Sequence, residues 1–137
     1  MLPDGGARGG FPAYGALVAS SRVRQAAFIG RLARAYARLF GVRAVARDGL
    51  VLCAGMPRRS FPRGGVTWGD TFLTAAAEEK LPAELLRNER VHVAQWQRHG
   101  LRFAVLYLLA GRNPGRNRFE VEAGLVDGGY APPGDGA

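Results

Sequence analysis

Residues 82–111, PAELLRNERVHVAQWQRHGLRFAVLYLLAG, decide the fold class of this chain. Their apolar residues recur with a period near 3.6, which is typical of helices. The proline that opens the segment suits a first helical turn, and each of its two glycines suits a helix end. The segment therefore predicts two consecutive helices, over 82–99 and 101–110.

Two shorter segments upstream of these helices predict β-structure. Residues 42–54, VRAVARDGLVLCA, hold two apolar runs on either side of Asp48-Gly49, which is a strong hairpin signal. Residues 65–75, GVTWGDTFLTA, are rich in β-branched and aromatic residues and predict a strand, a turn or bulge at Gly69-Asp70, and a second strand. We therefore expect a small antiparallel β layer ahead of the helices.

A further helix is predicted ahead of the β layer, over 20–40, with Ser20 or Ser21 as its cap and Gly41 as its stop. Its large apolar residues share one stripe, which we expect to face the core while arginines line a different, solvated face. The stripe consists of Phe28, Leu32, Tyr36 and Leu39. A basic amphipathic helix can also lie on a membrane surface or meet nucleic acid.

The elements combine into one α+β domain. Asn117 can cap a last helix over 118–127, so the order is helix, strands, then three helices. The domain is expected to span 20–127. Residues 1–19 and 128–137 are predicted to be flexible tails, because most of their length is rich in glycine and proline or lacks periodicity.

Composition narrows the protein class. The 137 residues suffice for one small domain, and a hydrophobic content of 47% excludes a mostly disordered chain. Cys53 is the only cysteine, so an intramolecular disulfide and a cysteine-based zinc cage are both excluded. The longest strongly apolar stretch, 103–110, is far shorter than the roughly 20 residues of a bilayer-spanning helix. With no secretory signal pattern, we expect a soluble, cytoplasmic protein.

Residues 88–92, NERVH, carry the pattern closest to a catalytic motif. Asn88 and His92 are four positions apart, so they point to the same helix face. In the metallopeptidase motif H-E-x-x-H, two histidines at that spacing bind zinc and the glutamate is the general base. Here the base and the second ligand are present, and asparagine takes the place of the first ligand.

The surrounding segments extend this pattern. LLRNERVHVAQWQRHGLRFAVLYL (85–108), GRNPGRNRFEVEAG (111–124) and the strand GVTWGDT (65–71) together resemble a family of small zincin metallopeptidase-like domains in bacterial proteins of unknown function. That family usually reads L-L-x-H-E-x-x-H-x-x-Q-W/Y, then an apolar helix with a tyrosine, then N-x-F-E-x-E-A. The resemblance covers about residues 65–127.

The resemblance implies a zinc site. It assigns Glu89 as the general base, His92 as a zinc ligand and either Glu120 or Glu122 as a third ligand. Glu120 is preferred because it stands in the E-x-x-A position that supplies the carboxylate in related gluzincin peptidases. In an active member, Glu89 would deprotonate a zinc-bound water that attacks a peptide carbonyl.

Asn88 is the departure from the family pattern. Its amide oxygen is a weak, neutral ligand, whereas zinc favours imidazole and thiolate. We therefore expect a degenerate metallopeptidase-related domain, a pseudoenzyme or a weak peptidase, in which Asn88, His92 and Glu120 hold zinc weakly or not at all. A peptide or protein is the implied substrate.

Each of these residues also has a structural interpretation. Asn88 can fill a vacated ligand position and hydrogen-bond His92, which can be an ordinary partly buried histidine. Glu89 can be a surface carboxylate. Glu120 lies three residues after Asn117, so it can close a capping box at the helix start.

Two nearby polar side chains have open roles. Gln95 can hydrogen-bond the site or the neighbouring backbone. Tyr107 can offer its hydroxyl to an oxyanion, or it can be a core aromatic with a polar tip.

The net charge of +8 supports a different function. Arginines spread along the chain could bind nucleic acid or an acidic partner without catalysis. They form no compact basic motif, and the chain carries no helix-turn-helix, zinc-finger or RNA-recognition signature.

Overall fold

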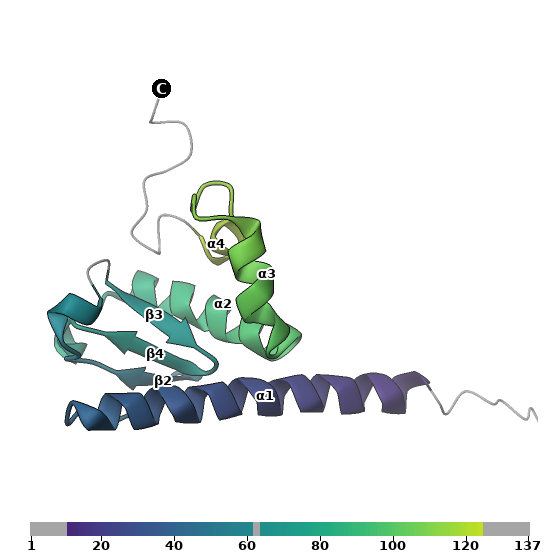
Figure 1. Ribbon diagram of the computed structural model, residues 1–137, viewed down its shortest axis with the longest axis horizontal. Helices are drawn as coiled ribbons and strands as arrows, with labels where there is room; N and C mark the ends of the chain where they lie inside the picture. The colour runs from purple at the N-terminus through teal and green to yellow at the C-terminus, as the bar shows by residue number, and fades with distance from the viewer. Residues whose placement is uncertain (1–10, 62–63, 125–137) are drawn as a thin grey trace, which may run out of the picture.

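A computed structural model of the chain describes residues 11–61 and 64–124 (Figure 1). Its elements, in chain order, are α1 (Phe11–Leu39), β1 (Val45–Arg47), β2 (Leu50–Cys53), β3 (Gly65–Trp68), β4 (Thr71–Thr74), α2 (Ala83–His99), α3 (Arg102–Ala110) and α4 (Arg118–Ala123). Short 3-10 turns lie at Arg58–Ser60 and Glu78–Lys80. The α+β class and the order of helix, strands and three helices are confirmed.

The four strands form one mixed sheet in the order β1-β2-β4-β3. β1 and β2 are an antiparallel hairpin, and so are β3 and β4, as the turn signals predict. The central pairing of β2 with β4 is parallel, so a purely antiparallel layer was wrong in this detail. The reason is that the second hairpin docks with β4, rather than β3, against β2, and hairpin signals carry no information on that long-range choice.

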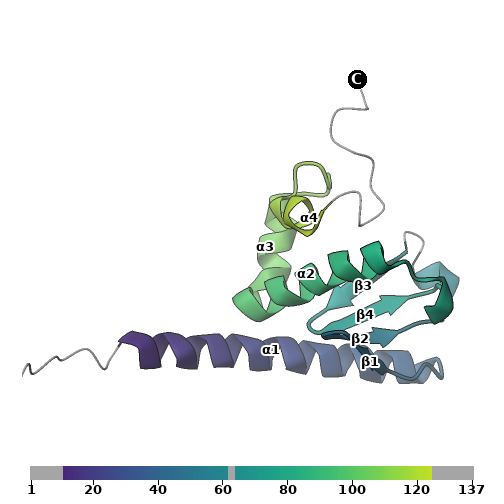
Figure 2. The same ribbon diagram turned by 180° about the vertical axis from the view of Figure 1, so that it is seen from behind.

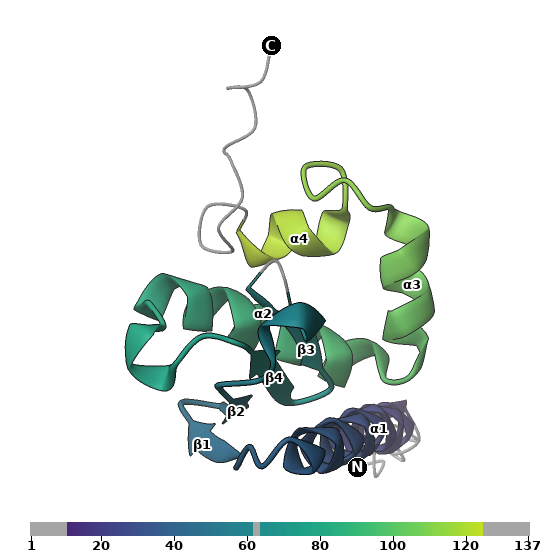
Figure 3. The same ribbon diagram turned by 60° about the vertical axis from the view of Figure 1, so that its left-hand side comes forward.

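The sheet lies between two helices that cover opposite faces (Figures 1 and 2). On one face, Cys53 and Leu73 pack against Ala33 and Ala37 of α1. On the other face, Leu52 and Phe72 cluster with Val93 of α2. Neighbouring residues of a strand face opposite sides of the sheet, because side chains alternate with a period of two. Phe103 of α3 and Phe119 of α4 cluster with Trp96 of α2 and Ala26 of α1. α4 lies on the side of α2 away from α1 (Figure 3).

Helix α1 departs from the sequence prediction in two ways. It begins at Phe11, so the predicted start at Ser20 or Ser21 was wrong, and residues 11–19 of the expected N-terminal tail are helical. Pro12 is tolerated because the N–H groups of a first turn have no partner within the helix. Its large apolar stripe faces solvent, with Leu39 81% exposed. The buried face is instead a row of small residues, Ala26, Gly30, Ala33 and Ala37.

The row of small residues lets α1 approach the turn between β3 and β4 very closely. A Cβ added at Gly30 would lie 1.7 Å from Oδ1 of Asp70, and one added at Gly69 would lie 2.0 Å from the carbonyl oxygen of Ala26. Arg34 forms a 2.9 Å ion pair with the same Asp70. This turn therefore determines which face of α1 is buried.

The later helices end where glycine requires it. α2 ends before Gly100, which has a φ of 65°, and α3 ends before Gly111, as predicted. α4 ends at Ala123 rather than at residue 127, because Gly124 has a φ of 88° that closes the helix. The predicted C-terminal tail and the remaining N-terminal residues lie outside the described ranges. Within those ranges, no helix is long and apolar enough to cross a membrane.

Candidate functional site

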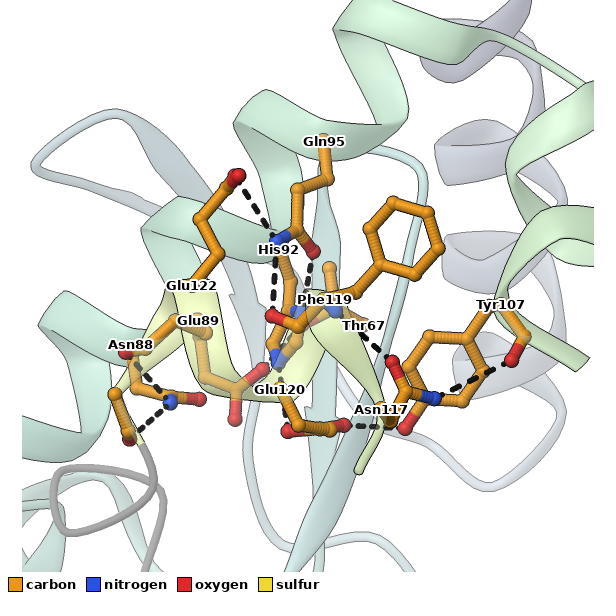
Figure 4. A network of polar contacts seen from close by, with 12 residues as sticks. Thr67, Asn88, Glu89, His92, Gln95, Tyr107, Asn117, Phe119, Glu120 and Glu122 are labelled. Atoms are coloured by element: carbon orange, nitrogen blue, oxygen red, sulfur yellow. Dashed lines mark hydrogen bonds and ion pairs between the residues drawn. The ribbon is translucent and has the colours of Figure 1, made fainter. Parts of the chain in front are cut away.

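Helix α2 carries a row of polar side chains that point into the protein interior. Asn88, Glu89, His92 and Gln95 are all buried, although the helix is amphipathic with arginines on its outer side. Buried polar groups need hydrogen-bond partners, because leaving one unsatisfied costs roughly 1–3 kcal/mol. Figure 4 shows that strand β3 and helices α3 and α4 supply these partners.

His92 lies at the centre of this polar cluster. Its Nδ1 is 2.8 Å from Oε1 of Gln95, and its Nε2 is 3.4 Å from Oε2 of Glu120. The Gln95 amide donates from Nε2 to the Phe119 carbonyl at 2.9 Å, so its oxygen accepts from Nδ1 of His92. This leaves Nε2 as the atom that faces the carboxylate.

Glu120 is brought to His92 by the first turn of α4. Asn117 caps that turn, since its side-chain oxygen accepts from the Phe119 amide at 3.0 Å. The other oxygen of Glu120 accepts a hydrogen bond from the Tyr107 hydroxyl. The Glu120 carboxylate thus contacts His92 and Tyr107, while the Asn117 N–H donates to the Asn113 carbonyl. The capping-box interpretation of Glu120 is therefore wrong. Tyr107 packs against the core as an aromatic with a polar tip, and its hydroxyl donates to Glu120.

Glu122 does not face His92. Its Oε1 accepts from Gln95 at 3.2 Å and lies 3.5 Å from Arg98 at the rim of the site. Glu120, and not Glu122, is therefore the carboxylate that contacts His92.

Glu89 approaches the cluster from the sheet side. Its Oε2 accepts a 2.5 Å hydrogen bond from Oγ1 of Thr67 on β3. Thr67 belongs to the predicted strand, but nothing in the sequence marked it as a partner of Glu89. Thr67 pairs with Phe72 across the sheet, so its side chain lies on the face that α2 covers.

Asn88 points away from His92. Its Nδ2 donates to two backbone carbonyls, those of Ala123 and Gly124, at 3.0 Å each. The interpretation that it hydrogen-bonds His92 was therefore wrong. The last carbonyls of a helix lack intrahelical partners, and the Asn88 amide satisfies them at the end of α4.

Electrostatics in the cluster favour a charged pair. Burial works against ionisation of His92, but hydrogen bonding and attraction to Glu120 outweigh it and raise the pKa of the imidazole. Burial also opposes the charge of Glu120, yet hydrogen bonds from His92 and Tyr107 lower the pKa of this carboxyl. Burial raises the pKa of Glu89, because its bond from Thr67 and its attraction to His92 compensate only in part.

The donor set does not complete a zinc site. Catalytic zinc sites supply three protein ligands and leave one open position. His92 and Glu120 supply two, and Nδ2 of Asn88 donates to the end of α4. Within residues 11–61 and 64–124, no three His, Cys, Asp or Glu side chains are grouped to hold a metal ion. Every fully buried side-chain nitrogen and oxygen in these ranges has a hydrogen-bond partner.

Comparison of the chain with protein-family models, with curated proteins and with solved structures found no significant match. The site's function therefore has to be argued from its residues.

Proposed function

We propose that this chain is a degenerate zincin-like domain, related to metallopeptidases, in which zinc-dependent peptide hydrolysis is weak or absent. The observation that carries the proposal is that buried His92 pairs with Glu120 at 3.4 Å and has Glu89 close enough to raise its pKa. These are the second ligand, the carboxylate and the base that the motif requires. They come from two helices separated by about thirty positions in the sequence.

The geometry around His92 supports a relation to metal sites. A metal-binding histidine donates its second ring N–H to an orienting group, which fixes the other nitrogen as the ligand. Gln95 has that orienting position at Nδ1, and Nε2 faces Glu120. In this chain the same arrangement holds an ion pair.

The asparagine at position 88, where the motif has histidine, supports weak or absent zinc binding. The amide is a poor zinc ligand, and its two hydrogen bonds now stabilise the end of α4. The position has thus exchanged a ligand's role for a structural one.

Elemental analysis of untagged protein dialysed against trace zinc tests the proposal. We expect far less than one zinc per wild-type chain. Asn88→His should raise zinc affinity at least about tenfold, since it restores the missing imidazole. Asn88→Ala is the matched control, because it loses the same hydrogen bonds and gains no ligand. Asn88→His/His92→Ala should lose the gained zinc.

Two results would contradict the proposal. One zinc per wild-type chain, lost in His92→Ala, would show a working site despite Asn88. An Asn88→His protein with a native circular dichroism spectrum and unchanged zinc affinity would show that the three positions do not form a ligand set.

Nucleic acid or an acidic partner is a second candidate, supported by one observation. Arg22, Arg98, Arg102 and Arg118 come from four different helices, and all lie close enough to His99 to lower its pKa, after the larger effect of burial. Salt-sensitive retention on heparin or DNA, weakened by glutamine substitutions at Arg22, Arg102 and Arg118, is the test of this candidate.

A further inference from the structure

The outward face of α1 exposes a row of large apolar side chains. Phe28 and Leu32 are 52% and 53% exposed, and Leu39 is 81% exposed. Tyr36 extends the row and packs edge-to-face on the exposed ring of Phe40, with ring centroids 5.2 Å apart. Soluble surfaces rarely gather this much apolar area without a partner.

A row of arginines runs beside this apolar row. Arg24, Arg31 and Arg38 recur every seven residues, so they share one side of the helix, and all three are exposed. At about 100° per residue, the arginine row is centred about 90° around the helix from the apolar row. Residues 11–39 contain no aspartate or glutamate, so α1 has no internal counter-charge for these three cations.

The position of α1 leaves both rows accessible along its length. The helix lies along one long side of the molecule, and β2–β4 and the later helices lie to one side of it (Figures 1 and 2). β1 lies beside its C-terminal end (Figure 3). Its small-residue face and the ion pair between Arg34 and Asp70 fix its rotation. The apolar and arginine rows are therefore presented together on one extended surface.

We propose that the outward face of α1 binds the surface of an anionic lipid bilayer. Interfacial helices insert a row of large apolar side chains below the headgroups, while basic side chains beside it contact anionic headgroups. A bilayer is flat and extended, and it satisfies both rows at once. The helix lies in the plane of the surface and does not span it.

Other occupants match these two rows less well. A second copy of α1 would bring two arginine rows together without any acidic residue to neutralise them. Nucleic acid would engage the arginines but would offer no apolar surface for Phe28, Leu32 and Leu39. Only a partner with both negative charge and an apolar interior uses the whole face.

Co-sedimentation of the full chain with vesicles tests this inference. We expect binding to phosphatidylcholine vesicles that contain phosphatidylserine, little binding to phosphatidylcholine alone, and weaker binding as ionic strength rises. Leu32→Ser/Leu39→Ser should weaken binding at least about tenfold. The matched control is Leu108→Ser/Leu109→Ser on α3, whose side chains are 76% and 79% exposed and should not matter.

A second set of variants tests how much the arginine row contributes to vesicle binding. Arg24→Gln/Arg31→Gln/Arg38→Gln should weaken binding about 100-fold, at about fivefold for each arginine. The control Arg58→Gln/Arg59→Gln/Arg112→Gln removes three exposed arginines elsewhere and should have a much smaller effect. All these positions are exposed, so unchanged melting temperatures should accompany the changes in binding.

Several outcomes would overturn the inference. They are no binding to either vesicle, equal binding to both, or equal losses in the α1 and α3 leucine variants. Dimerisation or DNA binding that depends on α1, in the absence of vesicle binding, would also overturn it and assign the face to those partners.

Discussion

Asn88 is a buried polar side chain at the edge of the cluster. The position is 2% exposed, so whatever stands there must have its polar groups satisfied. The NH2 group of Asn88 donates to two backbone carbonyls at the end of α4. The neighbouring His92 and Glu120 then neutralise each other as an ion pair. The cluster is held together by hydrogen bonds and this ion pair.

A prediction at the scale of single residues concerns Glu89 and the pH dependence of folding stability. Burial raises the pKa of its carboxyl, so Glu89 loses its proton at a lower pH in the unfolded chain than in the folded one. Stability is therefore lost as pH rises from the ordinary glutamate range through the raised pKa. Glu89→Gln removes this loss and keeps an oxygen for Thr67. We expect its melting temperature to exceed that of the wild type at about pH 8 and to match it at about pH 4.

Glu79→Gln is the control for this comparison, because Glu79 is an exposed glutamate outside the cluster. Its effect should be small at both pH values. A Glu89→Gln protein that is less stable than the wild type at high pH would show that the attraction between Glu89 and His92 outweighs the cost of burial.

Elements with strong local signals could be predicted from the sequence, and those that depend on distant contacts could not. The glycines after α2 and α3 and the Asp48-Gly49 turn are local signals, and the structure has these elements as predicted. In α1, periodicity identified which residues share a face but not which face is buried. The small-residue face is buried because Gly30 and Gly69 allow the close approach described above, and that contact joins segments forty positions apart.

The same distinction between local signals and distant contacts applies to the residues of the candidate site. Glu89 and His92 share a helix, so local spacing brings them together, and the resemblance to the zincin pattern supplied Glu120. The partners of Asn88 are backbone carbonyls, which have no sequence signature. Thr67 is joined to Glu89 only through the packing of β3 against α2.

The contact between α1 and the turn of the second hairpin can be tested at the scale of these elements. Gly30→Ala places a methyl group against the Asp70 carboxylate, and overpacking of this kind costs about 1–3 kcal/mol of unfolding free energy. On an unobstructed helix surface, the same substitution would stabilise the protein by up to about 1 kcal/mol. Urea denaturation of the two proteins distinguishes these results.

A double-mutant cycle assigns the loss to this contact. Asp70→Ala removes the carboxylate and the ion pair with Arg34, so it is destabilising alone. In the Asp70→Ala background, Gly30→Ala should cost much less than in the wild type. Equal costs in both backgrounds would mean that the Gly30 methyl meets a different obstacle.

At the scale of the whole molecule, the two proposed surfaces lie on opposite sides. The outward face of α1 points away from the sheet, whereas the polar cluster lies between α2, β3 and α4, beyond the sheet from α1 (Figures 1 and 4). No residue belongs to both, and substitutions without shared partners act additively. We therefore expect His92→Ala to leave vesicle binding unchanged to within about twofold. Leu32→Ser/Leu39→Ser should likewise leave the zinc affinity of an Asn88→His protein unchanged. A vesicle-binding defect in His92→Ala with an unaltered melting temperature would instead show that the cluster controls how α1 meets the lipid.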